Sequence, residues 1–179
     1  MNSEYYYGKK CDPILSIEEQ QIIVNWINEN YKLLECNGYN RYKIKLSLLK
    51  EKIEIPNCIY EIKKRIIEAE LLHDFDGEPL FEDSIGYMLN GAKLHKHTDP
   101  NHNNLVHTRF NVYVQLPYEG GYPIYNNNLY KLKERTYICC RAGIDYHECQ
   151  EVKGDKPRIM LSFGFLLPLD RVSKIIYDY

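Results

Sequence analysis

The residues that could do chemistry together begin with a histidine and an aspartate two positions apart, His97 and Asp99, in the segment Lys96-His97-Thr98-Asp99-Pro100. At the end of a strand, side chains two positions apart point the same way, so both could bind one cation. His147, 50 residues further on, enters a strand-like segment and is the candidate third ligand. Two imidazoles and one carboxylate leave three metal positions open, an arrangement typical of non-haem Fe(II) oxygenases.

The His-x-Asp pair alone is a weak signal, because a solvated turn at His-Thr-Asp-Pro would explain the same letters. Arg158 strengthens it. This arginine lies 11 residues after His147, in a largely apolar run that ends at Phe165. A guanidinium inside an apolar strand is costly unless an anion lies beside it. A dicarboxylate cosubstrate could supply that anion, since guanidinium binds carboxylates bidentately; the alternative is a salt bridge to Glu119 or Asp145.

These four residues resemble the motif of the Fe(II)/2-oxoglutarate-dependent dioxygenases, His-x-Asp, then His, then Arg or Lys, at His97, Asp99, His147 and Arg158. The resemblance covers roughly residues 85–167, about half of the chain. It implies a double-stranded β-helix (jelly-roll) core and hydroxylation of a C–H bond. It also implies Fe(II) as the metal and 2-oxoglutarate and O2 as cosubstrates, with ascorbate as a further cofactor that the family allows.

A finer likeness is to the prolyl hydroxylase branch, and it is carried by two tyrosines and a glycine pair. Tyr87 stands ten residues before His97, and Tyr113 lies on the following strand, ahead of Gly120-Gly121. By this resemblance Tyr113 would donate its hydroxyl to the far carboxylate of 2-oxoglutarate, beside Arg158, and Tyr87 would line the cosubstrate pocket. Both could instead be core tyrosines with a hydrogen-bonded hydroxyl.

Three other polar residues are candidates by strand parity. A related Arg-x-Ser signature would need serine at position 160, where this chain has Met160, but Ser162 has the parity to face the pocket and to substitute. Arg109 and Asn111 share a face with Tyr113, so they are candidate contacts of substrate or cosubstrate. The alternative places them at a wet barrel mouth.

The remaining histidines and the lysine clusters receive plainer interpretations. His95 shares the parity of His97 and could support it from behind, whereas His102 and His107 are expected to be ordinary surface histidines. The lysines at positions 43, 45, 50 and 52 are interpreted as a solvated face, given the glutamates nearby.

The substrate most consistent with the prolyl hydroxylase likeness is a protein side chain, proline first, so a protein or peptide is the expected partner. The segment between Pro100 and His107 is expected to edge the substrate cleft, and it is polar but not basic, which argues against a phosphate backbone. A nucleic-acid base demethylase of the same superfamily stays open. So do a catalytically inactive jelly-roll binding module and a cupin-like metal protein without 2-oxoglutarate.

The elements that must position these residues form an α+β pattern within 179 residues, which suits one domain. Residues 1–83 are predicted to be mainly helical and to pack on one sheet, with a capping box at Ser16 and Glu19 and a second helix after Pro56. Residues 41–53 fit either a strand or a helix. Residues 84–168 alternate like short strands and form the predicted β core that carries the metal site.

Composition narrows the setting of the protein. The net charge is −2, so no global basic field draws the chain to nucleic acid or to a membrane. No apolar run reaches the roughly 20 residues of a membrane span, and we expect no membrane partner. The six cysteines contain no CxxC pair, and the polar N-terminus does not resemble a secretory signal. We therefore expect reduced thiols and a cytoplasmic protein.

Overall fold

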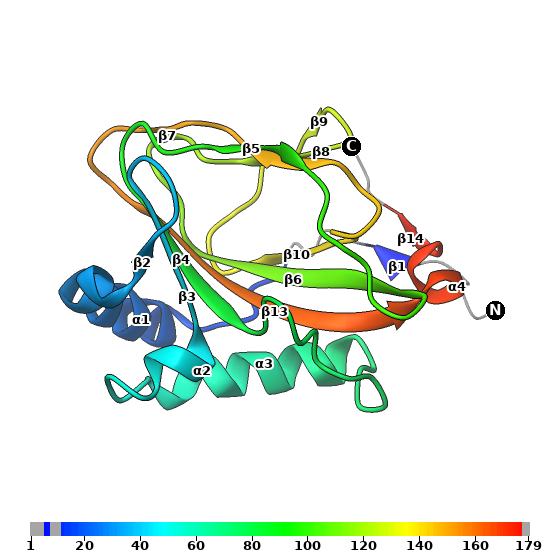
Figure 1. Ribbon diagram of the computed structural model, residues 1–179. Coiled ribbons are helices and arrows are strands. Elements are labelled where there is room, and N and C mark those ends of the chain that lie inside the picture. The colour runs from blue at the N-terminus through cyan, green and yellow to red at the C-terminus, as the bar shows by residue number, and fades with distance from the viewer. Residues whose placement is uncertain (1–5, 8–11, 177–179) are drawn as a thin grey trace.

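The computed structural model describes residues 6–7 and 12–176, which form three layers (Figure 1). A small sheet faces a larger sheet, and helices cover the outer side of the larger one. The helical elements are α1 (Ile17–Asn30), η1 (Tyr31–Leu33), α2 (Leu46–Leu49), α3 (Asn57–Ala69) and α4 (Leu169–Val172). The architecture therefore combines helices with sheets, as the α+β prediction states.

The larger sheet has six strands in the order β10-β6-β13-β4-β3-β2, and every pairing in it is antiparallel. Its members are β2 (Glu35–Cys36), β3 (Arg41–Lys45), β4 (Ser84–Met88), β6 (Leu105–Gln115), β10 (Tyr137–Cys140) and β13 (Arg158–Pro168). The two long strands, β6 and β13, lie next to each other near the middle of the sheet. Their register fixes which side chains share the inner face.

The smaller sheet has four strands in the order β5-β11-β8-β9, also antiparallel. They are β5 (Leu94–His97), β8 (Pro123–Tyr125), β9 (Asn128–Leu129) and β11 (His147–Cys149). Two further pairs are short: β7 (Glu119–Gly120) with β12 (Val152–Lys153), antiparallel, and β1 (Tyr6–Tyr7) with β14 (Ile175–Ile176), parallel. The space between the two sheets is where the candidate site lies.

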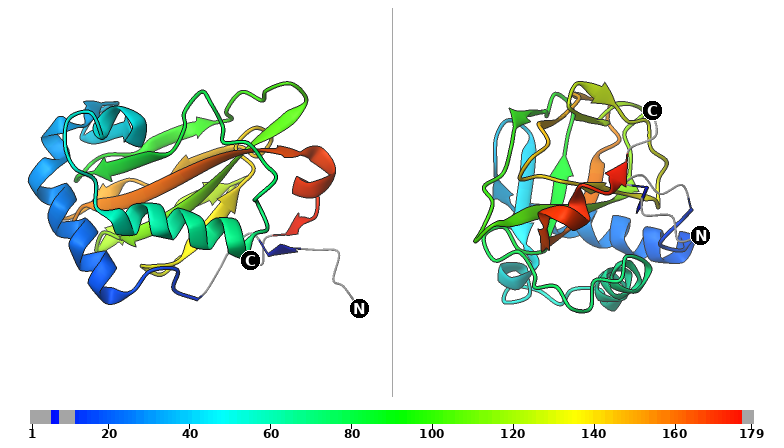
Figure 2. Two further views of the ribbon diagram at one scale, coloured as in Figure 1. Left: turned by 90° about the horizontal axis from the view of Figure 1, so that it is seen from below. Right: turned by 90° about the vertical axis from the view of Figure 1, so that its right-hand side faces the viewer.

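The helices are held by apolar stripes that face the larger sheet. Helix α1 begins at the predicted capping box, in which the Ser16 hydroxyl accepts from the Glu19 amide at 3.1 Å and the Glu19 carboxylate accepts from the Ser16 amide at 2.8 Å. Helix α3 buries Ile59, Ile62 and Ile66 completely, at the helical spacing that puts them on one side. Figure 2 shows both helices lying across the outer face of the sheet.

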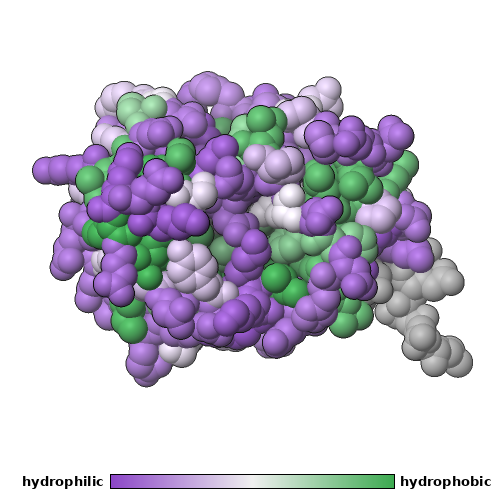
Figure 3. All heavy atoms as spheres, turned by 60° about the horizontal axis from the view of Figure 1, so that its bottom comes forward, coloured by the Kyte–Doolittle hydropathy of each residue, from purple (hydrophilic) through white to green (hydrophobic). Residues whose placement is uncertain are grey.

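The outward side of this helical layer is mostly hydrophilic, with hydrophobic side chains in separate patches (Figure 3). No helix in the described part of the chain has the length and apolar character needed to cross a bilayer. The described cysteines, Cys36, Cys58, Cys139, Cys140 and Cys149, are free thiols.

The ambiguous segment at residues 41–53 contains both elements that its pattern allows, because it forms strand β3 and then helix α2. Strand β3 pairs with β4, so the sheet extends into the part of the chain that we predicted to be mainly helical. A boundary at residue 84 thus does not separate helices from strands. Tyr42 and Ile44 of β3 point toward the helices and pack in the main core. Because side chains alternate along a strand, the residues between and beside them point into the space between the two sheets.

Replacing Ile62 with alanine should lower the free energy of unfolding by about 2–5 kcal/mol, because it opens a cavity between α3 and the sheet. Urea denaturation measures this change. The matched control is Ile22→Ala on α1. Half of the surface of Ile22 is exposed (50%), so a change of about 0.5 kcal/mol or less is expected there. Equal losses in the two variants would contradict the packing described here.

Candidate functional site

The three candidate metal ligands meet at one end of the smaller sheet. Antiparallel pairing of β5 and β11 sets His147 directly opposite His97, and Asp99 follows β5 by two residues. Asp99 Oδ1 lies 3.7 Å from His97 Nε2, and Asp99 Oδ2 lies 3.9 Å from His147 Nε2. One ligand atom from each residue lies within 4.8 Å of the others. This group could hold a metal ion.

Both imidazoles are oriented with the same nitrogen toward the backbone. His97 Nδ1 lies 2.7 Å from the carbonyl oxygen of His95, and His147 Nδ1 lies 3.1 Å from that of Asp145. A carbonyl oxygen accepts, so Nδ1 carries the proton and Nε2 presents a lone pair toward Asp99. Burial lowers the pKa of His147, which favours the neutral imidazole that a metal needs. His95 thus contributes its backbone, and its side chain is exposed.

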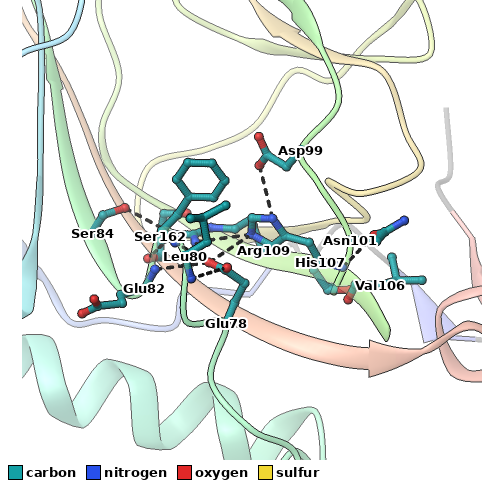
Figure 4. A network of polar contacts seen from close by, with 12 residues as sticks. Glu78, Leu80, Glu82, Ser84, Asp99, Asn101, Val106, His107, Arg109 and Ser162 are labelled. Atoms are coloured by element: carbon teal, nitrogen blue, oxygen red, sulfur yellow. Dashed lines mark hydrogen bonds and ion pairs between the residues drawn. The ribbon is translucent and has the colours of Figure 1, made fainter. Parts of the chain in front are cut away.

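His107, which lies on β6, stands behind Asp99 but makes no hydrogen bond to it through its buried Nδ1. His107 Nδ1 lies 3.6 Å from Asp99 Oδ2, and His107 Nε2 lies 3.6 Å from Glu78 Oε2 (Figure 4). The His107 side chain is fully buried, and burial, followed by the charge of Arg109, lowers its pKa to about 4. The expectation of a surface histidine is therefore wrong. The reason is that β6 is longer than the sequence pattern indicates, so His107 shares the inner face with Arg109 and Tyr113.

Arg109 belongs to an internally balanced network. Its guanidinium donates to Ser162 Oγ at 2.9 Å and to Ser84 Oγ at 3.2 Å, and it lies 3.5 Å from a carboxylate oxygen of Glu78. The Ser162 hydroxyl in turn donates to Asn111 Oδ1 at 2.6 Å. Arg109, Asn111 and Ser162 line the cavity as their strand parity predicts. Arg109 and Ser162 nevertheless have protein partners already, which leaves them less free to bind a ligand.

Arg158 lies on the same sheet face in a different electrostatic setting. Only 5% of its surface is exposed, and its two terminal nitrogens donate to the sulfur atoms of Met88 and Met160, each at 3.2 Å. Its Nε has no hydrogen-bond partner. Within residues 6–7 and 12–176, no carboxylate oxygen lies within 4.0 Å of this guanidinium. A buried positive charge is thus left without a negative one.

The salt bridges considered as alternatives for Arg158 are absent because both acids have other partners. Glu119 pairs with Lys153 at 2.5 Å, and Asp145 pairs with Arg141 at 2.7 Å. Both pairs form locally, one across the β7–β12 pair and one between residues four apart. The salt-bridge interpretation of Arg158 is therefore wrong.

Tyr113 lies beside Arg158, as the resemblance implied. Its ring is fully buried, and the guanidinium carbon of Arg158 lies 5.0 Å from the ring centre. Burial raises the pKa of Tyr113 to about 12, so the phenol keeps its proton and can donate it in a hydrogen bond. Gly121, at φ +69°, leaves room for this arrangement, because a Cβ there would come within 3.3 Å of the Arg158 side chain.

Tyr87 does not lie in the cavity, and the prediction for it is wrong. Its ring stacks on Tyr31 with 4.8 Å between ring centres, and its hydroxyl donates to Asn28 Oδ1 at 2.9 Å. Both partners belong to the helical layer. On β4, Ser84 and Met88 face the cavity, so Tyr87, one position away, faces the helices.

A cavity of about 790 Å³ lies between the two sheets and contains the candidate ligands, Tyr113 and Arg158 in its wall. Residues 100–107 are not among the residues that line it. The sequence interpretation missed Arg41 and Lys43 of β3, which do line it. The signal that could have found them is the alternation of Tyr42 and Ile44, which puts the basic residues on the opposite face.

No protein-family model matches the chain, and no curated protein matches its sequence. Among solved structures, it is similar to a prolyl-4-hydroxylase from Pseudomonas putida, with TM-score 0.58 and 12% identity over 90% of this chain and 93% of that one. It is also similar to HygX from Streptomyces hygroscopicus, solved with nickel, 2-oxoglutarate and hygromycin B, with TM-score 0.62 and 10% identity over 91% of this chain and 84% of that one. A third similar structure is SnoN, an alpha-ketoglutarate-dependent non-heme epimerase from nogalamycin biosynthesis, with TM-score 0.66 and 13% identity over 90% of this chain and 77% of that one. At these identities the likeness concerns the fold.

Glu78→Gln should lower the free energy of unfolding by about 3–5 kcal/mol, because it leaves the buried guanidinium of Arg109 without its counter-charge. The Leu80 amide donates to one carboxylate oxygen of Glu78 at 2.6 Å and the Phe81 amide donates to the other at 2.7 Å, so glutamine, which has one acceptor oxygen, also loses one of these hydrogen bonds. Glu61→Gln is the control, since its pair with Lys64 is exposed and such surface pairs contribute little to stability. Chemical denaturation in which Glu78→Gln unfolds like the control would contradict the network.

His147→Ala should weaken Mn(II) binding by more than about 100-fold, because removing only the groups that orient metal ligands already costs about 10–100-fold. Mn(II) stands in for Fe(II), its neighbour in affinity order, and titration followed by electron paramagnetic resonance counts the bound ion. His73→Ala, at an exposed histidine outside the cavity, should leave binding unchanged. Unaltered binding in His147→Ala would rule out this metal centre.

Proposed function

We propose that the chain is an Fe(II)- and 2-oxoglutarate-dependent dioxygenase that hydroxylates a C–H bond, with the two facing sheets forming a double-stranded β-helix. The observation that carries this proposal is the buried, uncompensated guanidinium of Arg158 in the same cavity as His97, Asp99 and His147. The solved structures of similar fold support it, since two of them are described as 2-oxoglutarate enzymes or complexes.

The donor set fits a ferrous ion. Two imidazole nitrogens and one carboxylate are the ligands that non-haem Fe(II) oxygenases use, with the remaining positions open to other ligands. His97 and His147 would bind through Nε2, because their Nδ1 atoms face backbone carbonyls. The backbone of Asp99 is fixed by its amide, which donates to the carbonyl of Ala142 at 2.7 Å.

The pocket around Arg158 fits the far carboxylate of 2-oxoglutarate. The Nε of Arg158 has no hydrogen-bond partner, and the two terminal nitrogens donate to methionine sulfurs, which are weak acceptors. The Tyr113 hydroxyl beside it is a further donor. A carboxylate placed there would receive charge-assisted hydrogen bonds and would balance the buried charge.

When bound, the iron and 2-oxoglutarate supply the oxidising power, with O2 converting the cosubstrate to succinate and CO2 as the substrate C–H bond is hydroxylated. The chain's own residues hold and orient these groups and keep water away. Met88 and Met160 flank the guanidinium with apolar surface, and such shielding strengthens every electrostatic contact inside.

The assembled ligands favour an enzyme over an inactive binding module, because a protein that binds without chemistry has no need to keep three ligands and an anion pocket together. Arg158 likewise favours 2-oxoglutarate over a cupin-like metal site without it. Proline or another protein side chain as the substrate remains a prediction from the sequence resemblance, which the similarity in fold to a prolyl-4-hydroxylase supports. A nucleic-acid base and a small metabolite stay as alternatives.

Arg158→Met should weaken 2-oxoglutarate binding to the Mn(II)-loaded protein by about tenfold or more, because one charge-assisted hydrogen bond contributes about 1.5–3 kcal/mol. Calorimetric titration measures this, and Mn(II) affinity should stay the same. The matched control is Lys153→Met, which removes an exposed charge outside the cavity. Undiminished 2-oxoglutarate affinity in Arg158→Met would sink the proposed cosubstrate site.

The effect of Arg158→Met on the stability of the ligand-free protein distinguishes an arginine that binds the cosubstrate from one that forms a salt bridge within the protein. Without ligand, Arg158→Met should leave the free energy of unfolding unchanged or raise it, because it removes a buried charge that no protein carboxylate balances. A loss of about 3–5 kcal/mol, as expected for breaking a buried ion pair, would indicate a protein partner instead.

A further inference from the structure

The cavity has a second cationic wall that the proposed function leaves unused. Arg41 and Lys43 lie at alternate positions of β3, opposite Met88 and Gly86 of β4. Met88 in turn lies opposite Arg158 on β13. Cross-strand partners point to the same face of a sheet, so both cations face the cavity with Arg158, and both line it.

Neither cation has an acidic partner among the residues that the structure describes. Arg41 donates only to the carbonyl and side-chain oxygens of Asn37, both at 3.3 Å, and Lys43 lies 5.3 Å above the ring centre of Phe81. Over the described part of the chain, no carboxylate oxygen lies within 4.0 Å of either. Lys45, the next inward residue of the same strand, shows the contrast, because it pairs with Glu82 at 3.2 Å.

Arg41 and Lys43 lie close enough to other positive charges to be repelled by them. Burial, followed by the charges of Arg109 and Arg41, lowers the pKa of Lys43 to about 8. Burial and the charge of Arg158 also lower the pKa of Arg41. Asp99 acts on both in the opposite direction, so the pair is close enough to interact with the candidate metal centre.

The sum of charges in a cavity that holds the metal and 2-oxoglutarate indicates that a further anion is needed. A divalent metal with Asp99 and a 2-oxoglutarate dianion leaves one negative charge, which Arg158 neutralises. Arg109 is balanced by Glu78, and Lys45 by Glu82. The other charged residues that line the cavity cancel in number (Glu35, Glu148, Lys93 and Lys96), so Arg41 and Lys43 remain as two positive charges. Side chains two apart on a strand are separated by roughly 6–7 Å, a span that one compact anion can bridge.

We propose that Arg41 and Lys43 bind a phosphate monoester, or a dianion of the same kind, on the substrate, and so direct the rest of that molecule toward the metal centre. The reaction that follows rests on the proposed function, whereas the anion site itself does not. A compact anion is favoured over a nucleic-acid backbone. The chain's net charge is −2, so there is no global basic field to attract a continuous polyanion.

The test is calorimetric titration of the metal-free protein with inorganic phosphate. The double variant Arg41→Gln/Lys43→Gln should bind phosphate at least about tenfold more weakly than the wild type, equivalent to about 1.4 kcal/mol. The control Lys50→Gln/Lys52→Gln removes the same charge from exposed lysines outside the cavity and should bind as the wild type does. Arg158→Met should retain phosphate binding. Circular dichroism of each variant confirms that it is folded.

Four outcomes overturn the proposal: no saturable phosphate binding, equal binding in the β3 variant, loss of binding in Arg158→Met instead, or acetate binding as tightly as phosphate. Tighter binding of a single-stranded oligonucleotide through the same two residues would also overturn it, because the occupant would then be a nucleic acid. Failure of the oxygenase proposal has a different signature, in which the wild type binds phosphate through β3 but does not bind Mn(II) and 2-oxoglutarate.

Discussion

The buried guanidinium of Arg158 is the constraint on which the site depends, and Arg109 shows why. Both arginines are 5% exposed and project from the same face of the larger sheet. Arg109 is neutralised by Glu78 and by hydroxyl and carbonyl acceptors, so its charge belongs to the architecture. Arg158 meets two thioethers and an aromatic ring. Burying a charge in this way is unfavourable without an anion, which is why the proposed function places a ligand carboxylate there.

The sheets make this possible through register. Antiparallel pairing of β4, β13 and β6 sets Met88 opposite Arg158 and Met160 opposite Tyr113, so one inner row surrounds the guanidinium. On the facing sheet, the pairing of β5 with β11 sets His97 opposite His147. The helices complete the layer arrangement by covering the outer face of the larger sheet with their isoleucines (Figure 1). Each functional side chain is thus placed by a strand, and loops contribute only Asp99.

The sequence predicted the parts of this arrangement that have a local signature. The capping box at Ser16, the helix after Pro56 and the convergence of His97, Asp99 and His147 were predictable, because spacing within a strand or helix determines direction. Tyr87 was misplaced, since its motif position says nothing about which face of β4 the helices cover. His107 and Lys43 were misjudged for a similar reason, since their surroundings come from parts of the chain distant in sequence: Lys43 lies opposite Gly86 of β4, and Phe81 packs against both side chains.

The most direct test of the account is a crystal structure of the protein grown anaerobically with Mn(II) and 2-oxoglutarate. The account predicts one ion bound by His97, Asp99 and His147, with the far carboxylate of the cosubstrate hydrogen-bonded to Arg158 and Tyr113. The contradicting result is a cosubstrate carboxylate bound elsewhere, or a protein carboxylate closed onto Arg158, with the histidines apart.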